Sequence, residues 1–195
     1  MFLSETKQKK NFEIRIKKIK ERSLLKKEEY QKFNKLIQIS FLNFLNKNNY
    51  SNVALYWSIN FEVNTQNIIK ELLEKKITIS LPQVINNKKM IFRKINSLDF
   101  DFEYFKNIKQ PTKKCSKINP KKIELIVVPL VSYNKKLFRL GYGTGFYDRF
   151  LNKYDKKDKI IKVGLGYKFQ ENDEFFVHKN DKKLNFIFNE EGIIK

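Results

Sequence analysis

The chain has 195 residues, 41% of them hydrophobic, and a formal net charge of +20 at pH 7. This length and apolar content allow one domain with a full hydrophobic core and exclude disorder of the whole chain. The single cysteine, Cys115, excludes an intramolecular disulfide and is interpreted as an ordinary thiol in a loop. No apolar run is long enough to span a membrane, and the basic beginning of the sequence has no apolar secretory core, so we expect a cytoplasmic protein.

The positive charge by itself does not identify a partner. A basic surface attracts phosphates of every kind, including those of RNA. Lysine greatly outnumbers arginine and occurs with abundant asparagine, isoleucine and phenylalanine, which is typical of an A/T-biased coding sequence. The sequence contains no RNP motif, zinc finger or convincing helix-turn-helix. We therefore expect no specific nucleic-acid partner, and a basic RNA-binding protein is kept as the weaker alternative.

The first half of the chain changes from helical to strand-like periodicity. Residues 12–26 mix basic and apolar residues and predict a basic N-terminal helix. The apolar stripe from residue 33 to residue 45 predicts a second helix. A short apolar run at 52–57, a helical pattern opening at Thr65 and another apolar run at 77–81 predict strand, helix and strand, hence a parallel βαβ unit.

The second half adds further strands around an irregular segment. Residues 90–95 predict a third strand, whereas 96–122 show little periodicity and predict a surface excursion, either a lid or a simple insertion. Residues 125–131 are the most hydrophobic run and predict a central buried strand, with the glycine-rich loop following it. Runs at 160–165 and 184–188 predict two more strands. The expected fold is α/β, a single domain over residues 1–195, with an open, mostly parallel, doubly wound sheet and helices on both faces.

Three of the six glycines fall within five residues: Gly141, Gly143 and Gly145. Glycine permits a positive φ and a close backbone approach, so successive N–H groups can face one anion, and a helix starting near Phe146 would add its free N–H groups. Arg139 supplies charge-assisted hydrogen bonds, and Asp148 is placed to cap the helix or to bind Mg²⁺. The pattern predicts a nucleotide-phosphate site. A plain tight turn is the alternative, because the lysine and hydroxyl residue of a Walker loop are missing.

Longer motifs around this loop resemble one enzyme family. Ile126-Val-Val-Pro-Leu-Val-Ser-Tyr-Asn134, then Arg139-Leu-Gly-Tyr-Gly-Thr-Gly-Phe-Tyr-Asp-Arg-Phe-Leu151, is similar to the signature of the 5-formyltetrahydrofolate cyclo-ligase (5,10-methenyltetrahydrofolate synthetase) family. Ala54-Leu-Tyr-Trp57 with Glu62-Val-Asn-Thr65, Leu81-Pro-Gln-Val84 and Val163-Gly-Leu-Gly166 resemble further family segments, in the same order, over roughly residues 12–190.

This resemblance implies a ligase that uses ATP and Mg²⁺ to cyclise 5-formyltetrahydrofolate to 5,10-methenyltetrahydrofolate. The formyl oxygen would be phosphorylated first, and ADP and phosphate would be released. The expected partners are therefore two small-molecule substrates, with no membrane involved, and the expected state is a monomer.

The resemblance also implies individual site residues. The expected ATP contacts are Lys10, Asn11, Arg15, Arg139, Leu140, Gly141, Tyr142, Gly143, Thr144, Gly145, Phe146 and Tyr147. The expected folate contacts are Tyr56, Trp57, Glu62, Tyr142 and Phe146. A carboxylate suits the pterin amino groups and an indole suits stacking on the ring, although a strand-end acid and a core aromatic are the simpler interpretation of Glu62 and Trp57. Arg139, Tyr147 and Asp148 are expected to be catalytic, and Asp148 and Asn185 to bind Mg²⁺.

Several positions depart from the family pattern. Asn11 stands at a lysine position, so that contact passes to the neighbouring Lys10 as a candidate. Phe146 stands for a tyrosine, Thr144 for a frequent lysine and Asn185 for an aspartate. From Asn185 we predict weaker Mg²⁺ binding than in relatives, and a catalytically weakened folate- or nucleotide-binding relative is the alternative function.

The only histidine, His178, lies in a polar stretch of the sequence. The reaction that the resemblance implies needs no histidine. We therefore expect His178 to have a surface or structural role.

Overall fold

The computed structural model describes residues 2–155 and 159–195. The first half of the chain forms α1 (Phe2–Ser23), α2 (Lys27–Asn48), β1 (Asn52–Ala54), α3 (Thr65–Glu74), β2 (Thr78–Asn86), β3 (Lys89–Ile95), β4 (Phe102–Phe105) and β5 (Ile108–Pro111). The second half forms η1 (Pro120–Lys122), β6 (Leu125–Val128), β7 (Ser132–Tyr133), β8 (Arg139–Leu140), α4 (Phe146–Tyr154), β9 (Ile161–Leu165), η2 (Lys168–Gln170), β10 (Phe186–Asn189) and β11 (Gly192–Ile194). Of the helices described, none is long and apolar enough to cross a membrane.

Within the described residues, seven strands form the central sheet, in the order β11-β10-β9-β6-β1-β2-β3. The strands from β10 to β2 are parallel neighbours, whereas β3 and β11 pair antiparallel at the two edges. The central strand β1 is paired on both sides, through Val53↔Ile79 and Val53↔Leu125. The predicted open, mostly parallel sheet is confirmed. The edge strand β11 was not predicted from the sequence.

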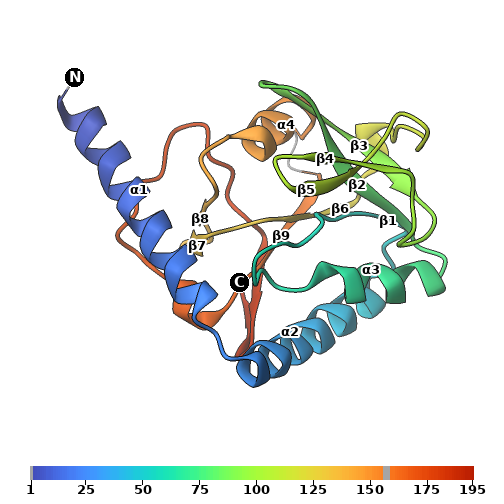
Figure 1. Cartoon of the computed structure of the whole chain (residues 1–195), viewed down its shortest axis with the longest axis horizontal. Coiled ribbons are helices and arrows are strands. Elements are labelled where there is room, and N and C mark those ends of the chain that lie inside the picture. Colours follow the sequence, from blue (N-terminus) through green and yellow to red (C-terminus); the bar gives the residue numbers. More distant parts are fainter. Residues whose placement is uncertain (1, 156–158) are drawn as a thin grey trace.

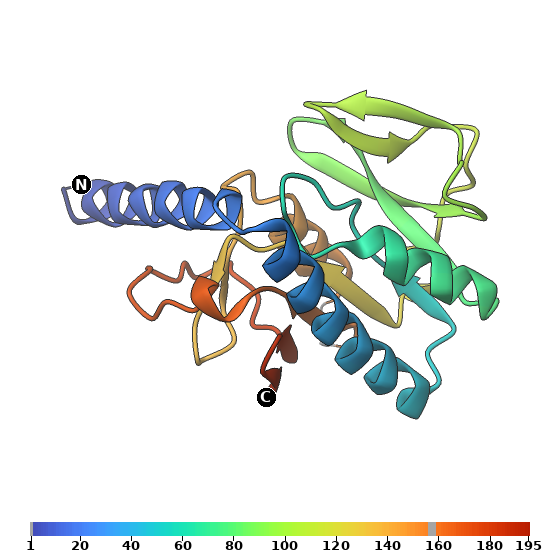
Figure 2. The ribbon, with the colours of Figure 1, turned by 60° about the horizontal axis from the view of Figure 1, so that its bottom comes forward.

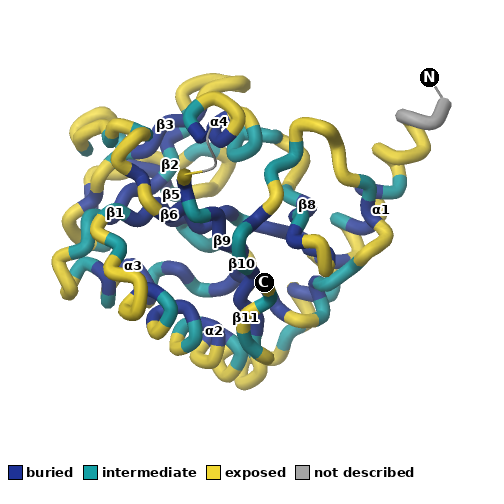
Figure 3. The backbone as a smooth tube through the Cα atoms, turned by 180° about the vertical axis from the view of Figure 1, so that it is seen from behind, coloured by how far each residue is buried: buried dark blue, intermediate teal, exposed yellow. Residues whose placement is uncertain are grey.

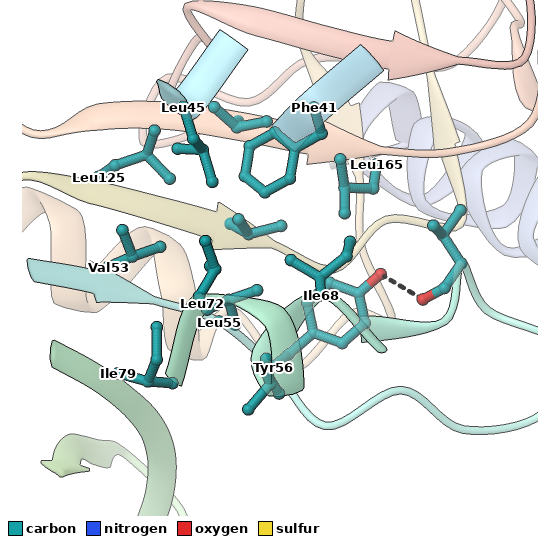
Figure 4. Packing of buried hydrophobic residues seen from close by; sticks show 14 of the residues in the cluster. Phe41, Leu45, Val53, Leu55, Tyr56, Ile68, Leu72, Ile79, Leu125 and Leu165 are labelled. Atoms are coloured by element: carbon teal, nitrogen blue, oxygen red, sulfur yellow. Dashed lines mark hydrogen bonds between the residues drawn. The ribbon is translucent and has the colours of Figure 1, made fainter. Parts of the chain in front are cut away.

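Helices cover both faces of this sheet, as predicted (Figure 1). Strand residues alternate between the faces. Val53 packs into the cluster that contains the apolar sides of α2 and α3, whereas Ala54 belongs to the cluster that contains Phe150 and Leu151 of α4. Figure 4 shows the first cluster, where Phe41 and other α2 residues face the strands. The strands are therefore buried on both sides while the outer helix faces are exposed (Figure 3).

Local sequence explains where these helices begin and end. The Asn64 side chain accepts a hydrogen bond from the Asn67 N–H and so caps the start of α3. Asn49 adopts the left-handed conformation, with φ 52°, and ends α2. The basic N-terminal helix, predicted over about 12–26, begins earlier, at Phe2, and also ends earlier, at Ser23.

The segment expected to be irregular, residues 96–122, contains a β-hairpin formed by β4 and β5. The prediction of little regular structure was therefore wrong in this part. The turn places Lys106 and Asn107 at positive φ, 48° and 63°, which is the geometry of a tight hairpin turn. The hairpin has no continuous buried apolar face. Its polar and aromatic residues therefore do not show the alternation of apolar and polar residues that indicates a strand.

The connections fix where a ligand can bind. The chain leaves β1, crosses one face as α3 and returns as β2, whereas it leaves β6, crosses the other face as α4 and returns as β9. A crevice therefore opens between the carboxyl ends of β1 and β6, where open α/β sheets bind ligands. The glycine-rich loop was expected to come just after the buried strand, but the small hairpin β7–β8 lies between β6 and the loop.

Candidate active site

A cavity of about 660 Å³ lies at this crevice, within the size range of small-molecule sites. Its walls come from α1, the β1–α3 loop, β2, β3, the β4–β5 hairpin, the β8–α4 loop and the segment before β10. Helix α1 and the hairpin stand on opposite sides of the molecule, at the left and upper right of Figure 2. The cavity is thus bounded by segments far apart in the sequence.

The glycine-rich loop approaches α1 closely. Gly143 and Gly145 have positive φ values, 91° and 66°, which favour glycine. A Cβ added at Gly143 would lie 3.6 Å from Arg15 Cζ, and Arg15 Nε donates to the Gly141 carbonyl at 2.7 Å. Burial lowers the pKa of Arg15 and the charge of Asp181 opposes this effect. A guanidinium group therefore lies directly against the loop.

Helix α4 begins at this loop without a side-chain cap among the described residues. Its first N–H groups are consequently open to a ligand, and the helix dipole favours an anion there. The predicted arrangement of three glycines followed by a helix start is therefore present, and the binding of an anion there stays a prediction.

Arg139, Asp148 and Tyr147 lie together beside the loop. Arg139 is buried and donates to the Asp148 carboxylate, with Nη2 to Oδ2 at 3.1 Å. Arg139 Nε and the Tyr147 hydroxyl are buried and have no hydrogen-bond partner among the described residues. Burial also raises the pKa of Tyr147, so its hydroxyl remains a donor. A buried donor without a partner costs roughly 1–3 kcal/mol, so two such donors at one cavity suit a ligand that brings acceptor oxygens.

A second polar group lines the same cavity around Glu62, and this part of the cavity is called its carboxylate end. Glu62 is 5% exposed and accepts hydrogen bonds from the Ile59 N–H at 2.9 Å and from the Tyr142 hydroxyl. Arg22 donates to the Tyr142 oxygen at 2.7 Å, and its Nη1 lies 4.0 Å from Glu62 Oε1. Burial raises the pKa of Glu62, and the charge of Arg22 opposes this increase. The cavity therefore holds a desolvated carboxylate at one end.

Trp57 lies between Glu62 and the hairpin. Its ring packs edge-on against Phe100 at 5.5 Å, and Lys109 Nζ lies 4.8 Å from its centroid. Lys109 also lies 4.0 Å from the Phe102 ring, so the ammonium joins the hairpin to the indole through cation–π contacts. The indole is partly exposed toward the cavity, where a flat aromatic ligand can contact it.

Most of the predicted site residues line this one cavity. They are Asn11, Arg15, Tyr56, Trp57, Glu62, Arg139, Leu140, Gly141, Tyr142, Gly143, Thr144, Gly145, Phe146, Tyr147 and Asp148. Residues separated by more than a hundred positions thus converge as expected. Tyr142 lines the cavity while it also contacts Glu62, which places the two predicted binding regions next to each other.

Of the two neighbouring α1 candidates, Asn11 lines the cavity as predicted and Lys10 does not. The Lys10 ammonium lies 3.5 Å from Glu174 and over the Phe176 ring. The Asn11 amide exchanges two hydrogen bonds with the Phe176 backbone, at 2.9 and 2.8 Å, so it attaches α1 to the segment between η2 and β10. Because neighbouring helix positions are about 100° apart, the face that carries Asn11 and Arg15 turns Lys10 away.

Asn185 differs from its predicted role as a metal ligand. Its Oδ1 accepts a hydrogen bond from the Lys162 N–H at 2.8 Å, near the amino ends of β9 and β10, and it does not line the cavity. The carboxyl edge, where the cavity opens, is at the other end of these strands. No cluster of three or more His, Cys, Asp or Glu side chains suited to a metal occurs in the described part of the chain.

Several cavity residues were not predicted from the sequence. Asp181 and His178 also line the cavity. His178 is exposed, as expected, but its place at the cavity was not expected. The hairpin contributes Phe105, Lys106, Ile108 and Gln110. Arg22 does not line the cavity but contacts Glu62 and Tyr142, and the sequence did not indicate it because it is one of many basic residues in its segment. Only the packing of α1 distinguishes it from its neighbours.

The fold and the cavity define a class of protein: a single-domain, doubly wound α/β enzyme with a glycine-rich loop and a buried carboxylate in one cavity. The family model of the 5-formyltetrahydrofolate cyclo-ligase family matches residues 6–190. The chain belongs to this family and is a ligase.

Relatives agree with this assignment. The chain is 32% identical over 140 residues to the 5-formyltetrahydrofolate cyclo-ligase of Mycoplasma pneumoniae, covering 71% of this chain and 73% of the relative. It is 31% identical over 134 residues to that of Haemophilus influenzae, covering 67% and 71%. Among solved structures, the 5,10-methenyltetrahydrofolate synthetase of Aquifex aeolicus superposes with a TM-score of 0.81 at 26% identity, covering 95% of this chain and 92% of the other. The synthetase of Mycoplasma pneumoniae gives 0.76 at 26% identity, covering 92% and 98%.

Proposed function

We propose that this ligase cyclises 5-formyltetrahydrofolate to 5,10-methenyltetrahydrofolate with consumption of ATP. The observation that carries the proposal is the single cavity in which the anion-binding loop and the buried Glu62 face one space. The loop suits phosphate and the carboxylate suits the amino groups of a pterin. Relatives named as cyclo-ligases support this assignment of the two ends.

In the proposed reaction, the formyl oxygen attacks the γ-phosphorus of ATP and ADP leaves. Nitrogen 10 of the folate then attacks the formyl carbon, the N10 proton is lost, and the C–O bond breaks to release phosphate. Phosphoryl transfer depends on positioning and on neutralising oxygen charge. Arg139, with its unpartnered Nε, and the Tyr147 hydroxyl are the donors that would stabilise this charge.

Asp148 would hold Mg²⁺ together with the ATP phosphates, since Mg²⁺ commonly uses one or two carboxylates and substrate phosphates. The ion would neutralise phosphate charge. The Asp148 carboxylate is oriented by Arg139 and by the Lys182 N–H at 3.3 Å. One carboxylate at the loop fits this mode of binding better than a protein cage, in keeping with the lack of a metal cluster in the described residues.

The test is the growth of methenyl-folate absorbance when purified protein is mixed with 5-formyltetrahydrofolate and MgATP. Wild type should show turnover with one ADP per product, and Asp148→Ala should lose most of it. Folded wild type without turnover would defeat the proposal. In that case, calorimetric binding of folate and ATP without ADP release would identify the weakened relative considered from the sequence.

A further inference from the structure

Arg22 lies behind the cavity, at the last turn of α1, with 2% of its surface exposed. It does not line the cavity, whereas both of its polar partners, Glu62 and Tyr142, do. A guanidinium group so far from solvent is costly unless charges and hydrogen bonds compensate it. The hydrogen bond to Tyr142 and the contact with Glu62 therefore connect Arg22 to the cavity.

The hydrogen bonds form a chain that runs from Arg22 through Tyr142 to Glu62. Arg22 Nη2 donates to the Tyr142 oxygen at 2.7 Å, and the Tyr142 hydroxyl donates to Glu62 Oε1. Arg22 Nη1 lies 4.0 Å from the same carboxylate oxygen. Tyr142 and Arg22 thus both lie at Oε1, whereas the Ile59 N–H donates to Oε2. The orientation of the carboxylate is thus set by groups from α1, the β1–α3 loop and the β8–α4 loop.

We infer that Arg22 is a positioning residue for folate binding, because it keeps the buried Glu62 carboxylate ionised and oriented toward the cavity. This inference rests on the proposed function, which assigns Glu62 to the pterin. Arg22 itself does not line the cavity, so it would act on the folate through Glu62 and Tyr142.

The groups that interact with Glu62 explain why one arginine has this effect. They are Arg22 from α1, Tyr30 from α2, Tyr56 after β1, Tyr142 from the glycine-rich loop and Tyr147 from α4. The four tyrosines are neutral donors near neutral pH because burial raises the pKa of each. Arg22 is the positive charge of this set. Without it, burial would favour the protonated carboxyl group.

The experiment measures binding of 5-formyltetrahydrofolate by calorimetry between pH 5.5 and 9, without ATP. Arg22→Met should bind about tenfold more weakly than wild type at pH 7, because a protonated Glu62 loses charge-assisted hydrogen bonds. Its affinity should recover as pH rises, since deprotonation restores the charge. Arg22→Lys should restore most of the affinity at pH 7, and ATP affinity should stay unchanged in both variants.

Lys18→Met is the matched control, because Lys18 attaches α1 to the Phe169 carbonyl without contacting Glu62. It should keep the wild-type pH profile. Arg22→Gln is a second variant that retains a donor for Tyr142 and removes the charge. Its folate affinity should likewise recover only at higher pH than in wild type, which keeps the test valid even if Arg22→Met fails to fold.

Two results would overturn the inference while leaving the proposed function intact. One is a wild-type pH profile in Arg22→Gln, and the other is an affinity loss that is constant over the whole pH range, which indicates a structural role. Absence of folate binding by the wild type would instead refute the proposed function.

Discussion

The two ends of the cavity are built in different ways. The anion-binding end consists mainly of one continuous segment, Arg139 to Asp148, supported by Arg15. The carboxylate end depends on Glu62, Tyr142 and Arg22, whose hydrogen bonds join residues 80 and 120 positions apart. Helix α1 supports both ends, through Arg15 at the first and Arg22 at the second, but most residues of the first end come from one segment, whereas those of the second come from three. Because phosphoryl transfer is proposed at the first end and pterin binding at the second, substitutions at the first end should mainly lower kcat. Substitutions at the second end should mainly weaken folate binding.

Arg139→Met should have the largest effect, since it removes the buried cation of the anion-binding end. We expect kcat to fall by about 10³-fold, because a preorganised donor to developing oxygen charge is lost. The KM for the folate should change little. Steady-state absorbance assays measure both constants, and Lys153→Met, an exposed change on α4, is the control. A fall in folate affinity with unchanged kcat would reverse the assignment of the two ends.

Glu62→Gln should come next and should act at the other end. We expect the KM for 5-formyltetrahydrofolate to rise by about 100-fold, in line with roughly 2–3 kcal/mol for hydrogen bonds to a buried charge, while the KM for ATP stays the same. Glu74→Gln, an exposed change on α3, serves as the control. Equal increases in both KM values would show that the ends are not separate.

The pH dependence of the wild type should sharpen this point. An ionised Glu62 is needed for binding, and burial raises its pKa above the ordinary value of 4.5. Folate affinity should consequently fall as pH is lowered through this raised pKa, at a higher pH than an exposed carboxylate would give. Calorimetric titration at several pH values measures the midpoint. In Glu62→Gln this step should disappear; its persistence would point to another group.

Gly143→Ala should have a smaller effect, on stability. Gly143 has φ 91°, which disfavours any residue with a Cβ, although the nearest atom would lie 3.6 Å away. We expect a loss of about 1 kcal/mol in the free energy of unfolding. Gly141→Ala is the matched control, since its Cβ meets no atom within 4 Å and its φ is not positive. Equal stabilities of the two variants in urea unfolding would contradict the strain at Gly143.

Asn185→Asp should have the smallest effect. The sequence predicted that Asn185 weakens Mg²⁺ binding, but the structure places its Oδ1 on the Lys162 N–H, and an aspartate oxygen can accept the same hydrogen bond. The Mg²⁺ concentration for half-maximal activity should therefore change by less than about twofold. A clear decrease would restore the original interpretation of Asn185 as a metal ligand.

The sequence by itself determined the parallel sheet, the helices on both faces and the loop from Arg139 to Asp148. These features depend on hydrophobic periodicity and on glycine conformation, which act over a few residues. Tertiary structure decided the rest. It turned Lys10 toward Glu174, directed Asn185 to a backbone N–H, and selected Arg22 from a segment full of basic residues. The packing of α1 determines which of its several basic residues is buried next to Glu62. These residues look alike in the local sequence, so the sequence could not identify Arg22.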